Sequence, residues 1–215
     1  MYERSRKTTS VRVPRAVTMS SRAKNPFPDK QVVTLRYCDA KTLDSTAGAS
    51  AKANFSANSL HDPDRTGTGH QPYGYDQYAA IYNHYKVLRS KITCIGVTTS
   101  PGVTAGNLVL GIGLKDDTTT ESDVSTLREA KGANFAVMSS YQKATVSNYW
   151  KKSLNFPNDG TYSTAAPIGS NPAEEMFFSV FSCHMDGSTE GGGCNIVITI
   201  EYVVEFFELK DLGQS

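Results

Sequence analysis

Apolar and polar residues alternate along several segments of this 215-residue chain, and a period of two predicts β-strands. The alternation is clearest near the C-terminus, where apolar side chains occupy every second position from Ile196 to Phe206. The opposite face of that segment carries Thr199, Glu201 and Glu205 among valines, so one face is predicted to lie in a core and the other to be partly wet. Eight strands are predicted in this way: 31–38, 51–58, 85–98, 106–114, 134–139, 142–150, 175–185 and 194–208.

A helical spacing occurs in a segment rich in tyrosine. Four side chains follow the order i, i+3, i+4, i+7 of a helix: Tyr78, Ile81, Tyr82 and Tyr85. Asp76 stands just ahead of them and is predicted to be the N-cap. The tyrosines are predicted to pack against a sheet edge. Two roles stay open for Tyr78, Tyr82 and Tyr85: packing in the core or at its rim, or forming a subunit contact, because tyrosine suits interfaces with one wet side.

The rest of the chain shows little helix. One further helical pattern spans 121–130, no internal repeat is present, and strands do not alternate with helices. A glycine-rich segment at 186–193 predicts a hairpin between the last two strands. Eight strands with little helix predict an all-β sandwich. The strand count fits an eight-stranded jelly roll, with two packed four-stranded antiparallel sheets and one or two short helices in loops.

The loops are uneven in length. The long ones follow the second, fourth and sixth strands, at 59–84, 115–133 and 151–174. Successive loops of a jelly roll emerge at alternating ends, so these three are predicted to share one end. The short connections at 99–105 and 186–193 belong to the other end. A body that is elaborated at one end and compact at the other suits a wedge packed around a symmetry axis.

The charge is divided unevenly, although the net charge is only +1. Residues 1–24 contain one acidic residue and seven basic ones, so this segment carries +6 and the remainder −5. The basic residues are Arg4, Arg6, Lys7, Arg12, Arg15, Arg22 and Lys24. Pro26 and Pro28 mark a boundary, so we predict a basic arm over 1–28 and a jelly-roll domain over 29–215. The arm is either a solvated tail without a partner or a segment that binds phosphates.

One block of the sequence combines order, spacing and context. It contains an Asn-x-Leu-x-Asp-Pro step at 58–63, a Gly-His-Gln-Pro turn at 69–72 and the run Tyr-Asn-His-Tyr-Lys-Val at 82–87. Together with the basic arm and the paired long strands near the C-terminus, this block resembles the capsid proteins of circular, Rep-encoding single-stranded DNA viruses, the circovirus-like group. The likeness covers most of residues 30–208.

This resemblance implies a shell subunit in a T=1 icosahedral capsid of about 60 copies. It implies circular single-stranded DNA as the packaged partner, contacted by the seven basic residues of the arm. It also implies a location in the virion, and in the host nucleus and cytoplasm during assembly, with no cofactor and no catalytic residue. The arm is shorter and poorer in arginine than the arms of that family, and its densest basic run is Arg4 to Lys7.

Other chemistries have little support in the sequence. Cys183, His184 and Cys194 lack the spacing of a zinc site, and the common nucleophile-elbow, P-loop and dinucleotide fingerprints are missing. Asp62 and Asp64 are expected to cap turns rather than to bind calcium. No apolar run reaches membrane-spanning length, and four widely spaced cysteines without an apolar leader predict reduced thiols.

Three functions therefore remain open: a DNA-packaging shell subunit, the coat protein of a small RNA virus, and a lectin-like module that binds a ligand with its long loops. The basic arm favours a shell over a lectin, and only the block at 54–93 favours DNA over RNA. A small aromatic and basic run, Tyr149 to Lys152, is a further candidate for a nucleic-acid contact, because bases stack on aromatic rings beside cations.

Overall fold

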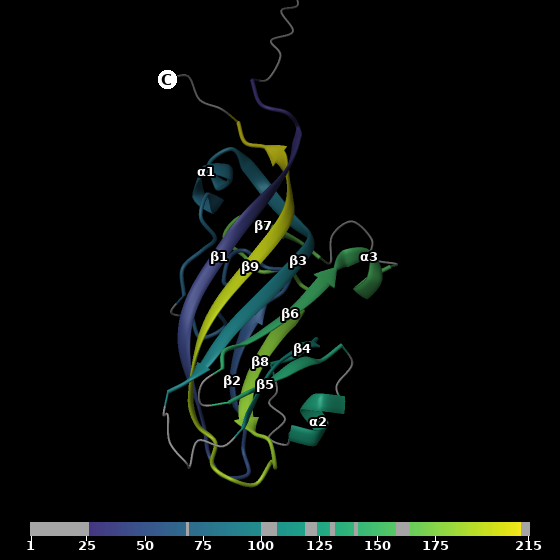
Figure 1. The fold of residues 1–215 in the computed structure, drawn as a ribbon. Helices are drawn as coiled ribbons and strands as arrows, with labels where there is room; N and C mark the ends of the chain where they lie inside the picture. The colour runs from purple at the N-terminus through teal and green to yellow at the C-terminus, as the bar shows by residue number, and fades with distance from the viewer. Residues whose placement is uncertain are drawn as a thin grey trace, which may run out of the picture.

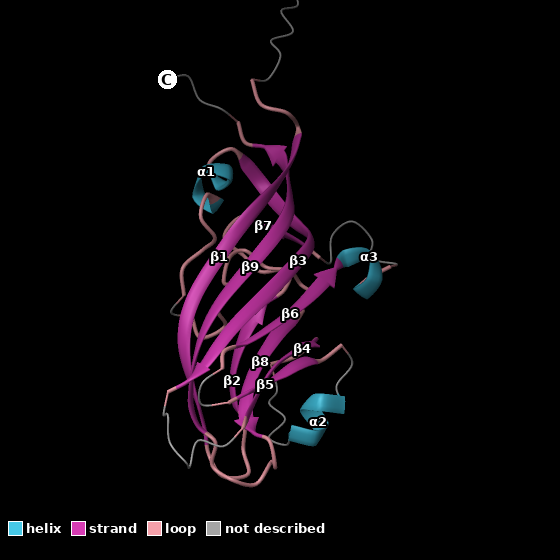
Figure 2. Cartoon of the chain, in the orientation of Figure 1, coloured by secondary structure: helices cyan, strands magenta, loops and turns pink. Residues whose placement is uncertain are grey.

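The computed structural model describes residues 26–67, 69–99, 107–118, 124–129, 132–139, 142–157 and 164–211. Within these residues the chain forms nine strands and three short helices (Figure 1). The strands are β1 (Lys30–Ser45), β2 (Ala51–Ser56), β3 (Tyr82–Thr98), β4 (Leu108–Lys115), β5 (Asn134–Met138), β6 (Ala144–Lys151), β7 (Ala165–Pro167), β8 (Phe177–His184) and β9 (Gly192–Leu209). The helices are α1 (Tyr75–Ala79), α2 (Val124–Glu129) and α3 (Lys152–Asn155), and they lie at the margins of the strands (Figure 2).

The strands form two antiparallel sheets. The first sheet has the order β1-β9-β3-β6, with β7 added beside β3, and the second has the order β2-β8-β4-β5. Apart from β7, the chain crosses from one sheet to the other at every connection except that between β4 and β5. This order is that of a jelly roll, so the predicted fold class is confirmed. The first sheet differs from the prediction in having five strands rather than four.

The predicted strands are all present, but some boundaries differ. β1 continues to Ser45 because it pairs with β9 as far as Gly192, although residues 39–45 are mostly polar. β7 was not predicted, since it has three residues and exists by pairing with His84 to Lys86 of β3. Helix α3 was also missed, whereas α2 lies within the predicted 121–130 segment.

The tyrosine-rich helix is shorter than its spacing predicted. Only Tyr78 of the four spaced residues lies in α1, because the chain re-enters the first sheet at Tyr82. The prediction of Asp76 as N-cap is wrong: Gly74 holds that position with a left-handed φ of 90°, which glycine adopts without strain. Asp76 instead lies in the first turn, where a carboxylate is favoured by the helix dipole.

The core lies between the two sheets. The six apolar residues predicted to share one face of the last strand, from Ile196 to Phe206, are each at most 1% exposed, which confirms that period. The largest fully buried side chains are Trp150, Tyr37, Tyr82, Tyr85, Tyr202, Phe55, Phe178, Phe181 and Phe206. Most of them belong to the main core, which the inward faces of both sheets supply.

A second, smaller core covers the outer face of the second sheet. It consists of Val109, Leu127, Phe181 and Cys183, and Leu127 comes from α2. The ring of Phe181 lies against Gly111 of the neighbouring strand, where a Cβ atom would come within 2.6 Å of ring carbon Cε1. The missing side chain of Gly111 therefore leaves the space that this ring fills.

The three long loops begin at one end of the sandwich, as predicted, although α2 in the loop after β4 packs back over the outer face of the second sheet. β2 and β4 both run antiparallel to β8, so the C-terminal ends of both strands lie at the same end of the second sheet. Residues that follow β2, β4 and β6, among them Arg65, Asp116 and Asn155, line one common pocket. The turn between β8 and β9 lies at the opposite end (Figure 1). We call these the loop end and the turn end.

Candidate functional site

The residues predicted to contact nucleic acid or other subunits fall into two groups. The seven basic residues of the arm lie outside the described residues. Tyr82 and Tyr85 are 2% and 0% exposed within their own chain, so they take the core role that the sequence left open. Tyr78 is half-buried and stacks on Phe206, with ring centroids 4.9 Å apart, and it alone of the three retains some surface.

The Tyr85 hydroxyl connects the first half of the motif block to the rest of the fold. It lies 3.0 Å from the Ser59 hydroxyl, donates to the Ser170 carbonyl at 2.8 Å and accepts from the Leu60 amide at 3.3 Å. Burial raises the pKa of Tyr85, so the hydroxyl keeps the proton that it donates. Asn58 beside it donates to the Glu174 carbonyl at 2.7 Å. This step therefore ties the loop after β2 to the chain ahead of β8.

The second half of the block packs against β1. The His70 ring lies 4.7 Å from the Tyr37 ring, and its Nε2 is 3.0 Å from the Cys38 carbonyl. Asp64, which is 2% exposed, accepts a hydrogen bond from Lys41 Nζ at 2.5 Å and another from the Thr66 hydroxyl at 2.8 Å. Burial alone would raise the pKa of Asp64, but these bonds outweigh burial and leave it below its usual value. The block that carries the family resemblance is thus a structural element.

The beginning of β1 is held at the loop end. The Tyr82 hydroxyl donates to the Pro28 carbonyl at 2.9 Å, and Lys30 pairs with Phe207 near the end of β9. The chain before Pro28 therefore leaves the body from a fixed point.

The candidate metal ligands are not brought together. Cys183 belongs to the outer core of the second sheet and Cys194 to the main core, while His184 Nδ1 lies 2.7 Å from Asp186. Among the residues that the structure describes, no group of three or more His, Cys, Asp or Glu side chains could hold a metal ion. No helix within the same residues is long and apolar enough to cross a membrane.

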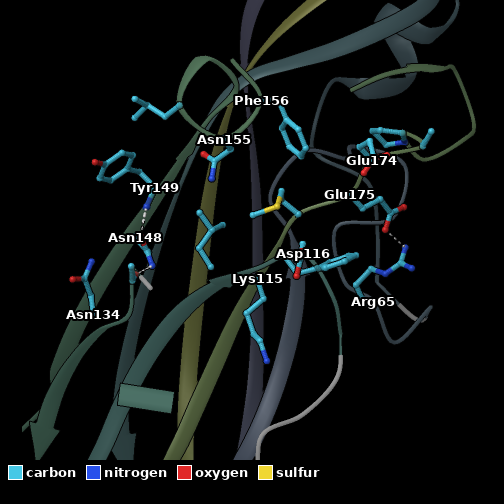
Figure 3. Close-up of a pocket in the computed structure, with 17 residues that line it drawn as sticks. Arg65, Lys115, Asp116, Asn134, Asn148, Tyr149, Asn155, Phe156, Glu174 and Glu175 are labelled. Carbon is cyan, nitrogen blue, oxygen red and sulfur yellow. Dashed lines mark hydrogen bonds and ion pairs between the residues drawn. The ribbon is translucent and has the colours of Figure 1, made fainter. Parts of the chain in front are cut away.

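A pocket of about 1350 Å³ opens at the loop end (Figure 3). Two of its charged side chains pair with each other: Glu175 lies 3.4 Å from Arg65, and burial raises the pKa of Glu175 while Arg65 opposes that effect. The Asn148 amide donates to the carbonyls of Ile112 at 2.9 Å and Gly132 at 2.7 Å. Residues near the ends of several strands line the pocket, and Tyr149 lies at its margin.

No helix of the described residues covers the outer face of the first sheet, and its side chains fall into rows set by the strand register. Toward the turn end the rows are apolar: Ile95 pairs with Val197, and these side chains are 40% and 54% exposed. Nearer the loop end the rows are basic. Arg89 pairs directly with Lys151, and Lys91 pairs with Tyr149, which is 62% exposed. Trp150, which lies between Tyr149 and Lys151 in the sequence, points to the inner face of the sheet and is fully buried.

Arg89 and Lys91 were missed by the sequence reasoning. Their outward orientation depends on a β-bulge, since the pairing of β3 with β9 shifts register between Val87 and Arg89. The sequence contains a sign of this bulge, because the apolar residues of the strand change from odd to even positions. Tyr85 and Val87 are buried at odd positions, but the next buried apolar residue is Ile92, at an even one. Such a change within one strand indicates an extra residue.

Comparisons with known proteins agree on the architecture. No protein-family model matches the chain, and no curated protein matches it. The fold is similar to a structure of Mud crab tombus-like virus, with a TM-score of 0.50 and 10% identity over 98% of this chain and 96% of that one. A 60-mer of the BFDV capsid protein has a TM-score of 0.49 and 12% identity, covering 88% of this chain and 100% of that one. Both structures come from viruses, and this chain has a jelly-roll fold.

Proposed function

We propose that this chain is the capsid protein of a small virus and that its copies assemble into a closed shell, in T=1 symmetry with about 60 subunits. The observation that carries the proposal is the union of two parts: a jelly-roll body, and ahead of it a segment with seven basic residues and one acidic residue. The chain acts by assembly and binding rather than by catalysis. It is located in the virion, and in the host nucleus and cytoplasm during assembly.

The packaged partner is circular single-stranded DNA in this proposal. The motif block at 58–87 supports DNA, because it resembles the circovirus-like capsid proteins. The basic arm neutralises phosphates, and weak contacts from many subunits add up in a closed shell through avidity. The coat protein of a small RNA virus is the second candidate, favoured by the likeness to a tombus-like virus structure.

The proposed subunit contact involves the tyrosine-rich segment. Tyr78 is the surface member of the proposed tyrosine contact, and Tyr82 and Tyr85 support it from within the core. In the rival function, a lectin-like module, the pocket at the loop end would bind a ligand and no shell would form.

Light scattering after size-exclusion chromatography, with electron microscopy of the peak, tests the shell. Closed particles of one small diameter are expected, and their 260/280 nm absorbance ratio reports nucleic acid. Treating the extracted nucleic acid with DNase or RNase separates the two viral candidates. A species that stays monomeric or trimeric at every salt and protein concentration would exclude the shell and favour the ligand-binding module.

Removing residues 1–24 tests the arm. The truncated chain is expected to fold and to package less nucleic acid, because it loses seven cations. A full-length variant with all seven changed to Gln is the matched control for length, and it should show the same deficit. Unchanged nucleic-acid content in both variants would rule out this role for the arm.

A further inference from the structure

We propose that the outer face of the first sheet binds single-stranded nucleic acid, through the cations of Arg89, Lys91 and Lys151 and through base stacking on Tyr149. This inference rests on the proposed function and deepens it, because it places a genome contact on the folded body in addition to the arm. We call these four residues the basic row.

The register brings the basic row together on two neighbouring strands. Arg89 lies directly opposite Lys151, and Lys91 lies directly opposite Tyr149, two residues further along β3. All four residues are exposed. An aromatic ring beside several cations is the arrangement with which proteins bind single strands without sequence preference: the cations contact the backbone and the ring stacks on a base.

The two glutamates of β9 on this face pair with other cations. Glu201 accepts a hydrogen bond from Arg36 at 2.6 Å, on the side away from β3. Glu205 lies 3.4 Å from Lys30 and 3.8 Å from Lys86. Lys91 also lies directly opposite Glu201 in the register of β3 with β9, but none of the three cations of the basic row makes an ion pair with another described residue.

The placement of like charges opposite each other also indicates an anionic partner. Directly opposite side chains of an antiparallel pair have Cβ atoms about 4.5–5.5 Å apart, and like charges at that separation destabilise the sheet. Arg89 and Lys151 therefore impose a cost on the isolated subunit. A phosphate between them removes the repulsion, and the exposed ring of Tyr149 favours a nucleic acid over an acidic protein segment.

The bulge in β3 is what presents the basic row. The residue between Val87 and Arg89 is extra relative to β9, so the alternation of faces changes at this point. In an unbulged strand that continued the parity of Tyr85 and Val87, Arg89 and Lys91 would point into the core. Bulges re-aim side chains near functional sites, and here the re-aimed side chains are two cations.

Two cations away from the basic row supply the control. Arg128 of α2 lies over Phe135, on the outer face of the second sheet, and Lys143 lies in the turn before β6. The variant R89A/K151A and the variant R128A/K143A each lose one arginine and one lysine, so they have the same net charge. The full-length chain, dissociated to subunits, is titrated onto fluorescein-labelled oligothymidylate or oligouridylate, and anisotropy is followed over a range of salt concentrations.

For R89A/K151A, the slope of log K against log salt is expected to fall in magnitude by about 1.4, because each phosphate contact with a single strand contributes about 0.7. R128A/K143A should keep the slope of the unmodified chain. Y149A should weaken binding by about 5-fold or more without changing the slope, since stacking does not release counterions, and Y149F should restore it. Equal results with both probes identify the shared phosphate and base chemistry, and a difference identifies the preferred strand.

Equal slopes for the two double variants would overturn the inference. Impaired assembly of R89A/K151A, with oligonucleotide binding unchanged, would also overturn it, because the face would then be a subunit contact. The proposed function is judged separately, by whether the unmodified chain forms particles. If the unmodified chain forms no particles, but R89A/K151A still has a smaller salt slope, the binding face is supported and the shell is refuted.

Discussion

Substituting Gly111 with alanine tests the small outer core that closes one side of the sandwich. A Cβ at this position would lie 2.6 and 2.7 Å from ring carbons Cε1 and Cε2 of Phe181, so the ring has to move. Phe181 is 0% exposed and packs with Val109, Leu127 and Cys183, which leaves little room for that movement. Gly113, on the same face of the same strand, has no atom within 4 Å of its Cβ position and is the matched control.

The magnitude follows from two routes that agree. Forcing an extra carbon into a packed site costs about 1–3 kcal/mol. Releasing the Phe181 ring to solvent instead costs about 1.5–3 kcal/mol of lost burial. G113A is expected to be neutral or to stabilise by up to about 1 kcal/mol, because alanine restricts the unfolded chain. The two variants should therefore differ by about 2–3 kcal/mol in the free energy of unfolding.

Urea unfolding of dissociated subunits measures this difference, and the single tryptophan, Trp150, is a buried fluorescence probe. In G111A, the further change F181L should recover part of the loss, which a double-mutant cycle detects. Unfolding free energies of G111A and G113A that agree within about 0.5 kcal/mol would refute the packing of Phe181 on Gly111, and with it the conclusion that this face is closed by its own side chains.

Three further outcomes are expected. Y85F should lower the free energy of unfolding by about 1–3 kcal/mol, because it leaves the partners of a buried hydroxyl unsatisfied, while Y78F should change it by less than about 0.5. K41M should lower the free energy of unfolding by about 2 kcal/mol at pH 7. Because the pKa of Asp64 is below its usual value, the stabilisation by ionised Asp64 is present above about pH 4 and is lost as the pH falls below it. The urea midpoints of K41M and the unmodified chain should therefore converge in acid. Maleimide at pH 8 should label one cysteine of the native subunit, Cys38, and all four after unfolding, as counted by mass spectrometry; rapid labelling of a second one would contradict the described burial.

The architecture was predictable where one face of a strand is buried and the other is wet. The period of two in β9 identified the core face without any knowledge of its partner strands. This method could not find β7 or the second half of β1, because neither has an alternating pattern of apolar and polar residues. Each is a strand because it pairs with a neighbour: β7 with β3, and β1 with β9. The loop end could be inferred because the alternation of strand direction is a property of the fold class.

The candidate site was less accessible to sequence reasoning. Tyr78, Tyr82 and Tyr85 have helical spacing, yet two of them are strand residues, because spacing alone does not show where a short helix ends. The outward turn of Arg89 depends on the parity change at the bulge, which becomes meaningful once β9 is known as the neighbour.

The bond from Tyr82 to Pro28 gives the arm a fixed origin, and so sets the reach of each of its charges. A chain spans at most about 3.3–3.6 Å per residue, so Lys24, four residues before Pro28, stays within roughly 14 Å of the body, while Arg4 can extend to about 85 Å. The Lys30–Phe207 row and the Arg89 row are four residues apart along β9, or about 13 Å. In the proposed function, Lys24 is therefore within reach of the same stretch of a single strand as the basic row, whereas the chain length also allows Arg4 to contact nucleic acid much farther from the body.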